Sequence, residues 1–168
     1  MSKLAGTVVA LSLALAAPAA ARAAPLGPEA AACSGGKPAV LVRVEGFKQR
    51  TGNLRVQIYG DRAEDFLAKG KRLKRIDLPV TASGVMDVCV GLPAVGTYAV
   101  AVRHDLDGNG KSGWSDGGGF SRNPGISITS LKPRYRDVAI TVGADVRTID
   151  VVLNYRRGLS IGPVKSGG

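Results

Sequence analysis

The sequence predicts an all-β domain, a seven-stranded antiparallel β-sandwich with one short helix and one long loop. Short segments in which apolar and polar residues alternate recur through the middle of the chain. Most connections between them are short and carry Gly, Pro or Asn. Hydrophobic residues make up 45% of the 168 residues and aromatic residues only 5%, and there are 23 glycines. This composition indicates an aliphatic core with many turns and excludes a disordered polyelectrolyte.

Residues 1–23 have the features of a signal peptide. Lys3 gives a positive start, an apolar run follows, and Ala21-Arg22-Ala23 supplies the small residues of a cleavage site. A membrane anchor is the alternative, but the run is mostly Ala and is interrupted by Pro18. We therefore expect an exported protein, periplasmic or extracellular, with no transmembrane anchor after cleavage.

The rest of the chain divides into a linker, a sandwich domain and a tail. Residues 24–37 are rich in Ala, Gly and Pro without a period, which predicts a linker. The sandwich is expected over residues 38–157, and residues 158–168 should form a flexible tail. The expected strands are residues 40–44, 54–58, 75–81, 85–92, 97–105, 137–142 and 147–154.

Two segments of the sandwich are not predicted as strands. Residues 61–69 have a helical pattern that Gly70 ends, and they are long enough for two turns. Residues 106–136 form a far longer connection than is usual in a compact domain. Long loops of this kind commonly carry function.

The chain has two cysteines, Cys33 and Cys89. Export places a protein in an oxidising compartment, where such a pair is expected to form a disulfide. The alternative is two buried free thiols. A bridge would tie the N-terminal segment to the fourth predicted strand.

The long connection opens with a pattern of calcium ligands. Counted from Asp105, the oxygen-bearing residues Asp107, Asn109 and Asp116 occupy positions 3, 5 and 12 of the calcium loop, and the main-chain carbonyl of Lys111 occupies position 7. Calcium takes six to eight oxygen ligands, so carboxylates and carbonyls at alternate positions suit it. We expect one calcium ion to order this loop.

Two features of the same loop bear on that expectation. Gly110 permits the sharp turn that brings the later ligands round. Asp116 is one methylene shorter than the usual Glu, and Ser112 replaces an aliphatic residue, so the loop is not packed as in an EF-hand pair. The alternative is a plain Asx-rich turn, since Asp-Gly and Asn-Gly favour tight turns without an ion.

A basic run follows the expected helix, in a chain with a formal net charge of +10. Its members are Lys69, Lys71, Arg72, Lys74 and Arg75. Such a surface attracts anionic polymers, and the attraction weakens with salt. No aromatic residues are interleaved for stacking on bases, so we expect no sequence-specific nucleic-acid binding. A solvated loop is the alternative interpretation.

The sequence shows no complete set of catalytic residues, and we expect a protein that is not an enzyme. His104, the only histidine, lies beside Asp105, and a hydrolase using this pair is one hypothesis. The alternative is a structural polar residue at the end of a strand. Trp114 and Phe120 flank the acidic loop and are expected either to form an exposed apolar contact or to cover the end of the sandwich.

Six segments follow the pattern of a known family. They are residues 42–46, 52–56, 91–93, 96–100, 104–111 and 118–123. These segments resemble the bacterial domain-of-unknown-function family 2141, and the resemblance covers about residues 39–155. It implies an exported β-sandwich of the transthyretin or carboxypeptidase-regulatory type, and it supplies no activity. This sequence departs from the family's pattern at Ser112-Gly113-Trp114, so the resemblance does not itself support Asp116 as a calcium ligand.

Together these observations predict a non-enzymatic binding or accessory domain, exported, with one calcium ion in the 105–116 loop. The acidic face of the loop and Trp114 are then its expected contact surface. The alternative is a basic envelope protein that docks on anionic polymers through Lys69–Arg75. The natural ligand or partner and the oligomeric state are left open by the sequence.

Overall fold

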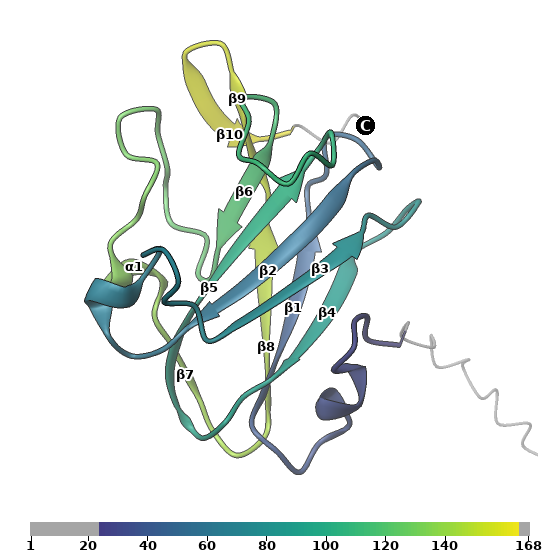
Figure 1. The fold of residues 1–168 in the computed structure, drawn as a ribbon, viewed down its shortest axis with the longest axis vertical. Helices are drawn as coiled ribbons and strands as arrows, with labels where there is room; N and C mark the ends of the chain where they lie inside the picture. Colours follow the sequence, from purple (N-terminus) through teal and green to yellow (C-terminus); the bar gives the residue numbers. More distant parts are fainter. Residues whose placement is uncertain (1–23, 165–168) are drawn as a thin grey trace, which may run out of the picture.

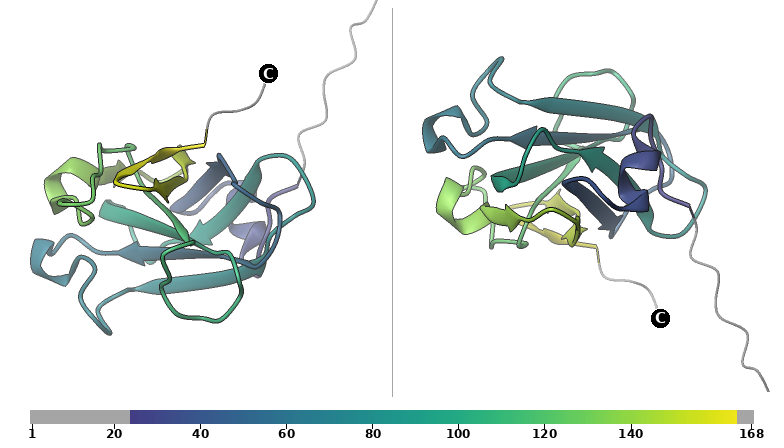
Figure 2. Two further views of the ribbon diagram at one scale, coloured as in Figure 1. Left: turned by 90° about the horizontal axis from the view of Figure 1, so that it is seen from above. Right: turned by 90° about the horizontal axis from the view of Figure 1, so that it is seen from below.

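The computed structural model describes residues 24–164, whose strands form two packed sheets (Figure 1). The prediction of an all-β sandwich is therefore confirmed, and Figure 2 views the sandwich from its two ends. The expected signal peptide, residues 1–23, lies outside the described residues, as do residues 165–168. No helix between residues 24 and 164 is long and apolar enough to cross a membrane.

The smaller sheet has the order β4-β1-β8. Its strands are β1 (Ala39–Glu45), β4 (Met86–Gly91) and β8 (Val146–Val152). The central strand β1 is antiparallel to β4 and parallel to β8. The parallel pair departs from the purely antiparallel sandwich that the sequence predicts. Parallel neighbours need a long crossover, and here all the strands of the larger sheet up to β7 lie between β1 and β8.

The larger sheet has the order β10-β9-β6-β5-β2-β3, and β7 pairs with β5. Its strands are β2 (Asn53–Tyr59), β3 (Lys74–Pro79), β5 (Gly96–Asp105), β6 (Gly117–Phe120), β7 (Ile140–Val142), β9 (Asn154–Arg157) and β10 (Ser160–Pro163). The seven predicted strand regions are all represented, and β6, β9 and β10 are additional.

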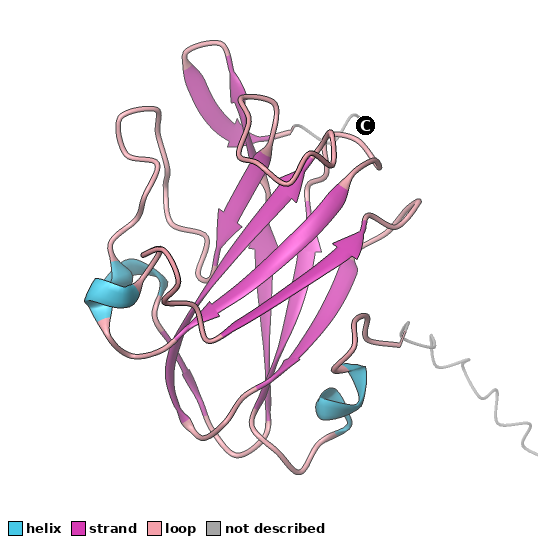
Figure 3. Ribbon diagram, in the orientation of Figure 1, coloured by secondary structure: helices cyan, strands magenta, loops and turns pink. Residues whose placement is uncertain are grey.

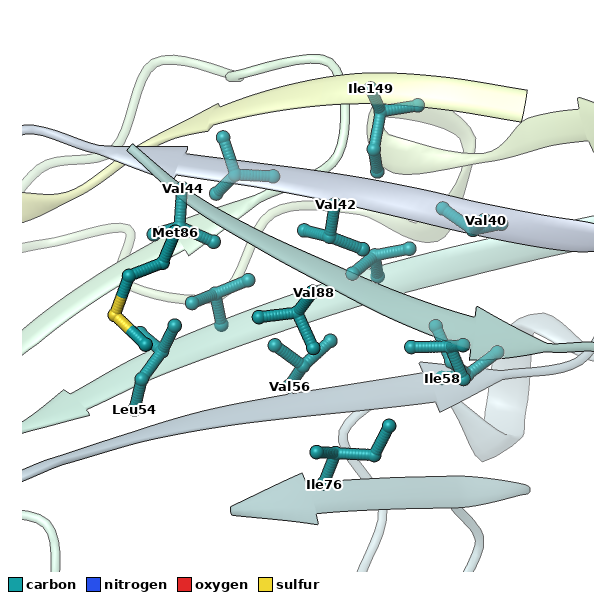
Figure 4. Packing of buried hydrophobic residues seen from close by; sticks show 14 of the residues in the cluster. Val40, Val42, Val44, Leu54, Val56, Ile58, Ile76, Met86, Val88 and Ile149 are labelled. Atoms are coloured by element: carbon teal, nitrogen blue, oxygen red, sulfur yellow. The ribbon is translucent and has the colours of Figure 1, made fainter. Parts of the chain in front are cut away.

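The core lies between the sheets and consists mainly of aliphatic side chains. Val40, Val42 and Val44 of β1 are fully buried and point the same way because alternate residues of a strand share a face. They pack with residues of the other sheet such as Val56, as Figure 4 shows. Each such side chain contributes about 1.5–3 kcal/mol by its burial. The period-two pattern therefore predicts the core correctly.

A disulfide joins Cys33 to Cys89, which confirms the predicted pair. It attaches the short 3-10 helix η1 (Ala30–Ser34) to β4. The segment predicted to be a linker is docked on the sheet as well. The Leu26 amide donates to the Asp87 carbonyl over 2.6 Å, and the Cys89 amide donates to the Leu26 carbonyl over 3.1 Å.

The predicted helix over residues 61–69 is only the 3-10 turn η2 (Ala63–Asp65). The chain leaves the helical path at Phe66, whose ring packs edge-on against Tyr59 and Tyr135. Leu67 then has a φ of 61°, which no helix continues through. Packing of this partly buried aromatic ring has outweighed the local helical preference.

The strand predicted over residues 137–142 starts later than expected. Its first part belongs to the single helical turn α1 (Tyr135–Val138), and only Ile140–Val142 forms β7. The short helical turns lie at the margins of the sandwich in Figure 3. Val138 is fully buried from this turn in a small cluster with Tyr59 and the β5 residues Ala99 and Ala101.

The long connection 106–136 contains a strand that the sequence does not predict. Gly117, Gly118 and Gly119 have no apolar alternation, yet they form most of β6. A Cβ on Gly119 would lie 2.7 Å from Cγ1 of Val151, so the close approach to β8 requires glycine. At the C-terminal end, β10 lies within the segment predicted to be a flexible tail and pairs with β9. The sheet therefore continues beyond the expected end of the sandwich at residue 157.

Candidate metal centre

The site is built where β5 ends and the long connection begins. Asp105 is the last residue of β5, pairs in register with Asn53 of β2, and is 2% exposed. The neighbouring turn must approach closely to allow this. Gly52 has a φ of 72°, and a Cβ there would collide with the main-chain carbonyl of Asp105. The strand pair thus fixes the first residue of the candidate loop.

Three carboxylates meet at this point. Asp105, Asp107 and Asp116 each offer one oxygen, and these oxygens all lie within 4.8 Å of one another. Two oxygens bound to one calcium ion can be no more than about 5 Å apart, since each bond is about 2.5 Å long. The acidic cluster can therefore hold a metal ion. It includes Asp116, which follows the segment where this sequence departs from the family's pattern.

The two oxygens of the Asp105 carboxylate differ in their surroundings. Oδ2 accepts hydrogen bonds from the Gly110 amide over 2.8 Å and from Arg103 Nη2 over 3.3 Å. Oδ1 is buried and has no hydrogen-bond partner among the described residues. A buried charged oxygen without a partner is unfavourable by several kcal/mol. A cation beside Oδ1 would remove this penalty.

The middle of the loop is exposed and folded by short hydrogen bonds. The Asn109 amide donates to Oδ1 of Asp107 over 3.2 Å, and its side chain donates to Oδ2 over 2.6 Å. The Lys111 amide donates to Oδ1 of Asn109 over 2.7 Å. These are the bonds of an Asx-rich turn, and the plain-turn interpretation shares them. Each accepting oxygen keeps a second lone pair, so the bonds do not exclude an ion.

Asp116 folds the end of the loop back onto its start. Its Oδ1 accepts a hydrogen bond from the Leu106 amide over 3.2 Å, and its Oδ2 accepts one from the Gly113 amide over 2.9 Å. The loop lies at the top of Figure 1, beside the β9–β10 hairpin. Asp116 is thus directed toward Asp105 by the main chain of its own loop.

Arg103 is a neighbour of the site that the sequence analysis missed. Its Nη1 donates to Oγ of Ser112 over 2.9 Å, and Nη2 reaches Asp105. Residues two apart in a strand share a face, so the alternation in β5 already places Arg103 beside Asp105. The guanidinium partly neutralises Asp105 and links β5 to the loop.

His104 lies on the opposite face of β5 and is fully buried. Its Nε2 is 2.8 Å from the Thr51 carbonyl and its Nδ1 is 2.6 Å from the Tyr155 hydroxyl. A carbonyl can only accept, so Nε2 carries the proton and Nδ1 accepts from Tyr155. Burial raises the pKa of Tyr155 to about 12. The geometry gives no support to a hydrolase using His104 with Asp105, because both ring nitrogens are occupied and the carboxylate is on the other face.

Three members of the basic run form ion pairs with carboxylates, and two form none among the described residues. Lys74 Nζ lies 2.7 Å from a carboxylate oxygen of Glu29. The Lys71 ammonium is 3.8 Å from Asp65, and Arg75 pairs with Asp77. Burial acts to raise the pKa of Asp77, but hydrogen bonds from arginines outweigh it and lower that pKa. Three of the five cations of the run, Lys71, Lys74 and Arg75, are therefore paired with carboxylates.

Lys69 and Arg72 are the other two members of the basic run. Both are exposed, and neither has an ion-pair partner within residues 24–164. They are the part of the run that is available to an external anion.

Trp114 and Phe120, which flank the loop, have different environments. Trp114 is 78% exposed, and the guanidinium of Arg156 lies 3.7 Å from its ring centroid. Phe120 is half-buried and packs edge-on against Phe66, with 6.1 Å between the ring centroids. Of the two sequence interpretations, exposure holds for Trp114, and packing onto the sandwich holds for Phe120.

The segment 118–123, which carries part of the family resemblance, connects the sheets. The Ser121 side chain is fully buried, accepts from the Val100 amide and donates to the Val138 carbonyl over 2.5 Å. Asn123, with a φ of 45°, donates to the Asp150 carbonyl and accepts from the Val152 amide of β8. These bonds give Ser121 and Asn123 structural roles.

Comparison with known proteins adds one finding. No curated protein matches the chain. No solved structure matches it either. The family model described as "Uncharacterized protein conserved in bacteria (DUF2141)" matches residues 42–150, which include strands of both sheets and the whole 105–116 loop. The chain belongs to this family of bacterial proteins.

Proposed function

We propose that the protein is an exported, non-enzymatic binding domain whose 105–116 loop is ordered by one calcium ion. The observation that carries this proposal is the buried Oδ1 of Asp105, which lacks a hydrogen-bond partner among the described residues, in a carboxylate that clusters with those of Asp107 and Asp116. A bound cation would satisfy that oxygen and offset the repulsion among the three acids.

The chemistry of the donors favours calcium. The clustered groups are all carboxylates, which suit hard cations, whereas transition metals are usually held by imidazole or thiolate. The Asn109 side-chain carbonyl and the Lys111 main-chain carbonyl are the further ligands we assign. Calcium accepts such an irregular set of six to eight oxygens, whereas magnesium demands a strict octahedron and keeps several waters.

Export is supported by two features. One is the signal-peptide pattern of residues 1–23, and the other is the Cys33–Cys89 disulfide, a bond that persists in oxidising compartments. Extracellular calcium modules bind in about the 10⁻⁴–10⁻³ M range. We expect this loop, with its many exposed ligands, to bind calcium with similar strength.

The binding role is supported by the exposed surface beside the loop. Trp114 presents a large apolar ring to solvent next to the acidic cluster. Loops held by a rigid scaffold commonly carry recognition surfaces. His104, the one residue that suggested catalysis, has both ring nitrogens bound to protein groups.

Calorimetric titration of calcium into chelator-stripped protein comprising residues 24–168 tests the proposal. We expect one saturable site in the wild type and none in Asp107→Ala. The matched control is Asp145→Ala, which removes an exposed carboxylate from the turn before β8 and should leave binding unchanged. Absence of saturable binding at several millimolar calcium, or equal binding in Asp107→Ala, would reduce the loop to a turn.

A second candidate function is docking on anionic polymers of the cell envelope through Lys69–Arg75. It is supported by Lys69 and Arg72, whose charges have no ion-pair partner within the described chain. Dextran sulfate is a suitable probe. Its binding should weaken steeply between about 50 and 200 mM salt, because binding to a polyanion releases counterions.

The comparison of two double variants decides this second candidate. Lys69→Ala with Arg72→Ala should weaken dextran sulfate binding more than Lys132→Ala with Arg147→Ala, which removes the same charge from other exposed positions. Equal weakening in the two double variants would show attraction by net charge and no docking site.

A further inference from the structure

A second site adjoins the candidate metal centre. A pocket of about 300 Å³ lies between the 105–116 loop, the connection that follows β6, and the β9–β10 hairpin. These three segments lie at the upper end of the molecule in Figure 1. The volume is at the lower end of the range of small-molecule sites, so a ligand of modest size would fit.

The wall of the pocket is mainly apolar. Ile126, Ile128 and Leu131 line it from the connection after β6, and Ile161 lines it from β10. Gly117 and Gly118 of β6 also line the pocket, and they contribute no side chains to it. Ligand sites typically combine such an apolar lining with a few polar groups that orient the ligand.

The rim of the pocket exposes large apolar side chains to solvent. Trp114 is 78% exposed, Leu131 is 55% exposed and Ile128 is 37% exposed. Apolar side chains that are exposed singly are ordinary on a protein surface, but these three converge on one pocket. A ligand that covered them would remove apolar area from water on both partners.

The cationic group of the lining that is free to bind an anion is Arg156. Its guanidinium stacks on Trp114, and its Nε donates to the Gly158 carbonyl over 2.9 Å. No carboxylate within the described residues forms an ion pair with Arg156, whereas Arg103, the other arginine of the lining, is paired with Asp105. The carboxylate of Asp116 accepts hydrogen bonds from its own loop.

We propose that this pocket binds a small apolar monocarboxylate. The hydrocarbon part lies against Ile126, Ile128 and Leu131, and the carboxylate binds the guanidinium of Arg156. An arginine can hold a carboxylate through two parallel hydrogen bonds, which gives orientation as well as affinity. A cationic head group would be repelled by Arg156, and an uncharged one would leave the guanidinium without its anion.

The inference rests on the proposed binding function but does not require the metal ion, since most of the lining comes from outside the 105–116 loop. Octanoate is the probe, with octan-1-ol and octylammonium as controls that keep the chain and change the head group. Binding is measured by calorimetry, and the fluorescence of Trp114 gives a local readout because it is the only tryptophan in the chain.

We expect octanoate to bind at one saturable site, at least about tenfold more tightly than either control, as a charge-assisted hydrogen bond implies. Arg156→Gln should weaken octanoate binding by about tenfold or more and leave octan-1-ol unaffected. The matched control is Arg157→Gln, the next residue of β9, which is exposed and does not line the pocket. Equal affinity for octanoate and octan-1-ol, or an equal effect of the two arginine variants, would overturn the proposal.

The same measurements in Asp107→Ala, with chelator present, separate this inference from the calcium proposal. Octanoate binding that persists there, together with loss of calcium binding, supports both assignments. Failure of octanoate to bind wild-type protein that binds calcium overturns only the proposal for the pocket. Failure of calcium to bind wild-type protein that still takes octanoate overturns only the metal centre.

Discussion

His104 and Asp105 are consecutive residues of β5, both buried, and they face opposite sides of the sheet. On the His104 side, each polar atom has a partner: the Thr51 carbonyl accepts from Nε2, and Tyr155 donates to Nδ1. On the Asp105 side, one carboxylate oxygen has no partner among the described residues. Two buried polar residues in sequence thus differ in whether the fold completes their hydrogen bonding.

The difference separates structural from binding residues. A buried polar network that is fully satisfied makes the packing specific and leaves nothing for a ligand to do. An incompletely satisfied buried charge is unfavourable unless another group compensates it. The comparison therefore indicates a stabilising role for the His104 side of β5, and it supports the proposed ion binding on the Asp105 side.

The largest effect is expected from His104→Ala. The variant leaves a cavity between the sheets and removes the partners of the Tyr155 hydroxyl and the Thr51 carbonyl. The free energy of unfolding should fall by about 4 kcal/mol, measured by urea denaturation. Calcium affinity of the folded variant should be unchanged. Loss of calcium binding in His104→Ala protein that remains folded would contradict a purely structural role for His104.

The next effect concerns Asp105 itself. Calcium at about one hundred times its Kd should raise the free energy of unfolding of the wild type by about 2.7 kcal/mol. Asp105→Asn loses the charge that binds the ion, so its stability should not respond to calcium. Thermal unfolding with calcium and with chelator measures both. If Asp105→Asn gains as much stability from calcium as the wild type, the ion binds elsewhere.

The pH dependence of stability tests the structural role of the His104 side of β5. Burial raises the pKa of Tyr155 to about 12 in the folded state, above its ordinary value of about 10. The folded protein therefore holds this proton more tightly than the unfolded chain, and the resulting stability is complete below pH 10. It should be lost as the pH rises through 12, by about 2 kcal/mol. In Tyr155→Phe, whose starting stability is lower, this alkaline loss should be smaller; an unchanged loss would assign it to other groups.

The smallest effect couples the Asp105 side to the neighbouring pocket. Asp116 belongs to the acidic cluster and also lines the pocket of Arg156. Calcium neutralises its charge, so octanoate should bind about fivefold more tightly with calcium than with chelator. By linkage, octanoate should tighten calcium binding by the same factor. Two affinities that do not influence each other would show that the sites are independent.

The sequence predicted the features of this fold that depend on alternation. Val40, Val42 and Val44 read as one buried face, and they are fully buried. The prediction failed where the local sequence pattern gives no signal or where tertiary packing outweighs it. Gly117–Gly119 lack side chains to alternate, and their place in β6 depends on close contact with β8 that only the folded structure provides.

The ligand spacing likewise predicted Asp105, Asp107 and Asp116, because the positions of a calcium loop are local in sequence, and the three acids do converge. The unpartnered oxygen and the pocket were beyond prediction. Burial of Asp105 depends on the turn at Gly52, and Arg156 reaches Trp114 from a strand far along the chain.

A crystal structure of the protein grown with calcium would show directly whether an ion binds at Asp105. We predict one ion whose ligands include Oδ1 of Asp105 and oxygens of Asp107 and Asp116, each at about 2.4 Å. The His104–Tyr155 pair should be unchanged in that structure. A loop without an ion at saturating calcium, or an ion that leaves Oδ1 of Asp105 without a ligand bond, would contradict the account.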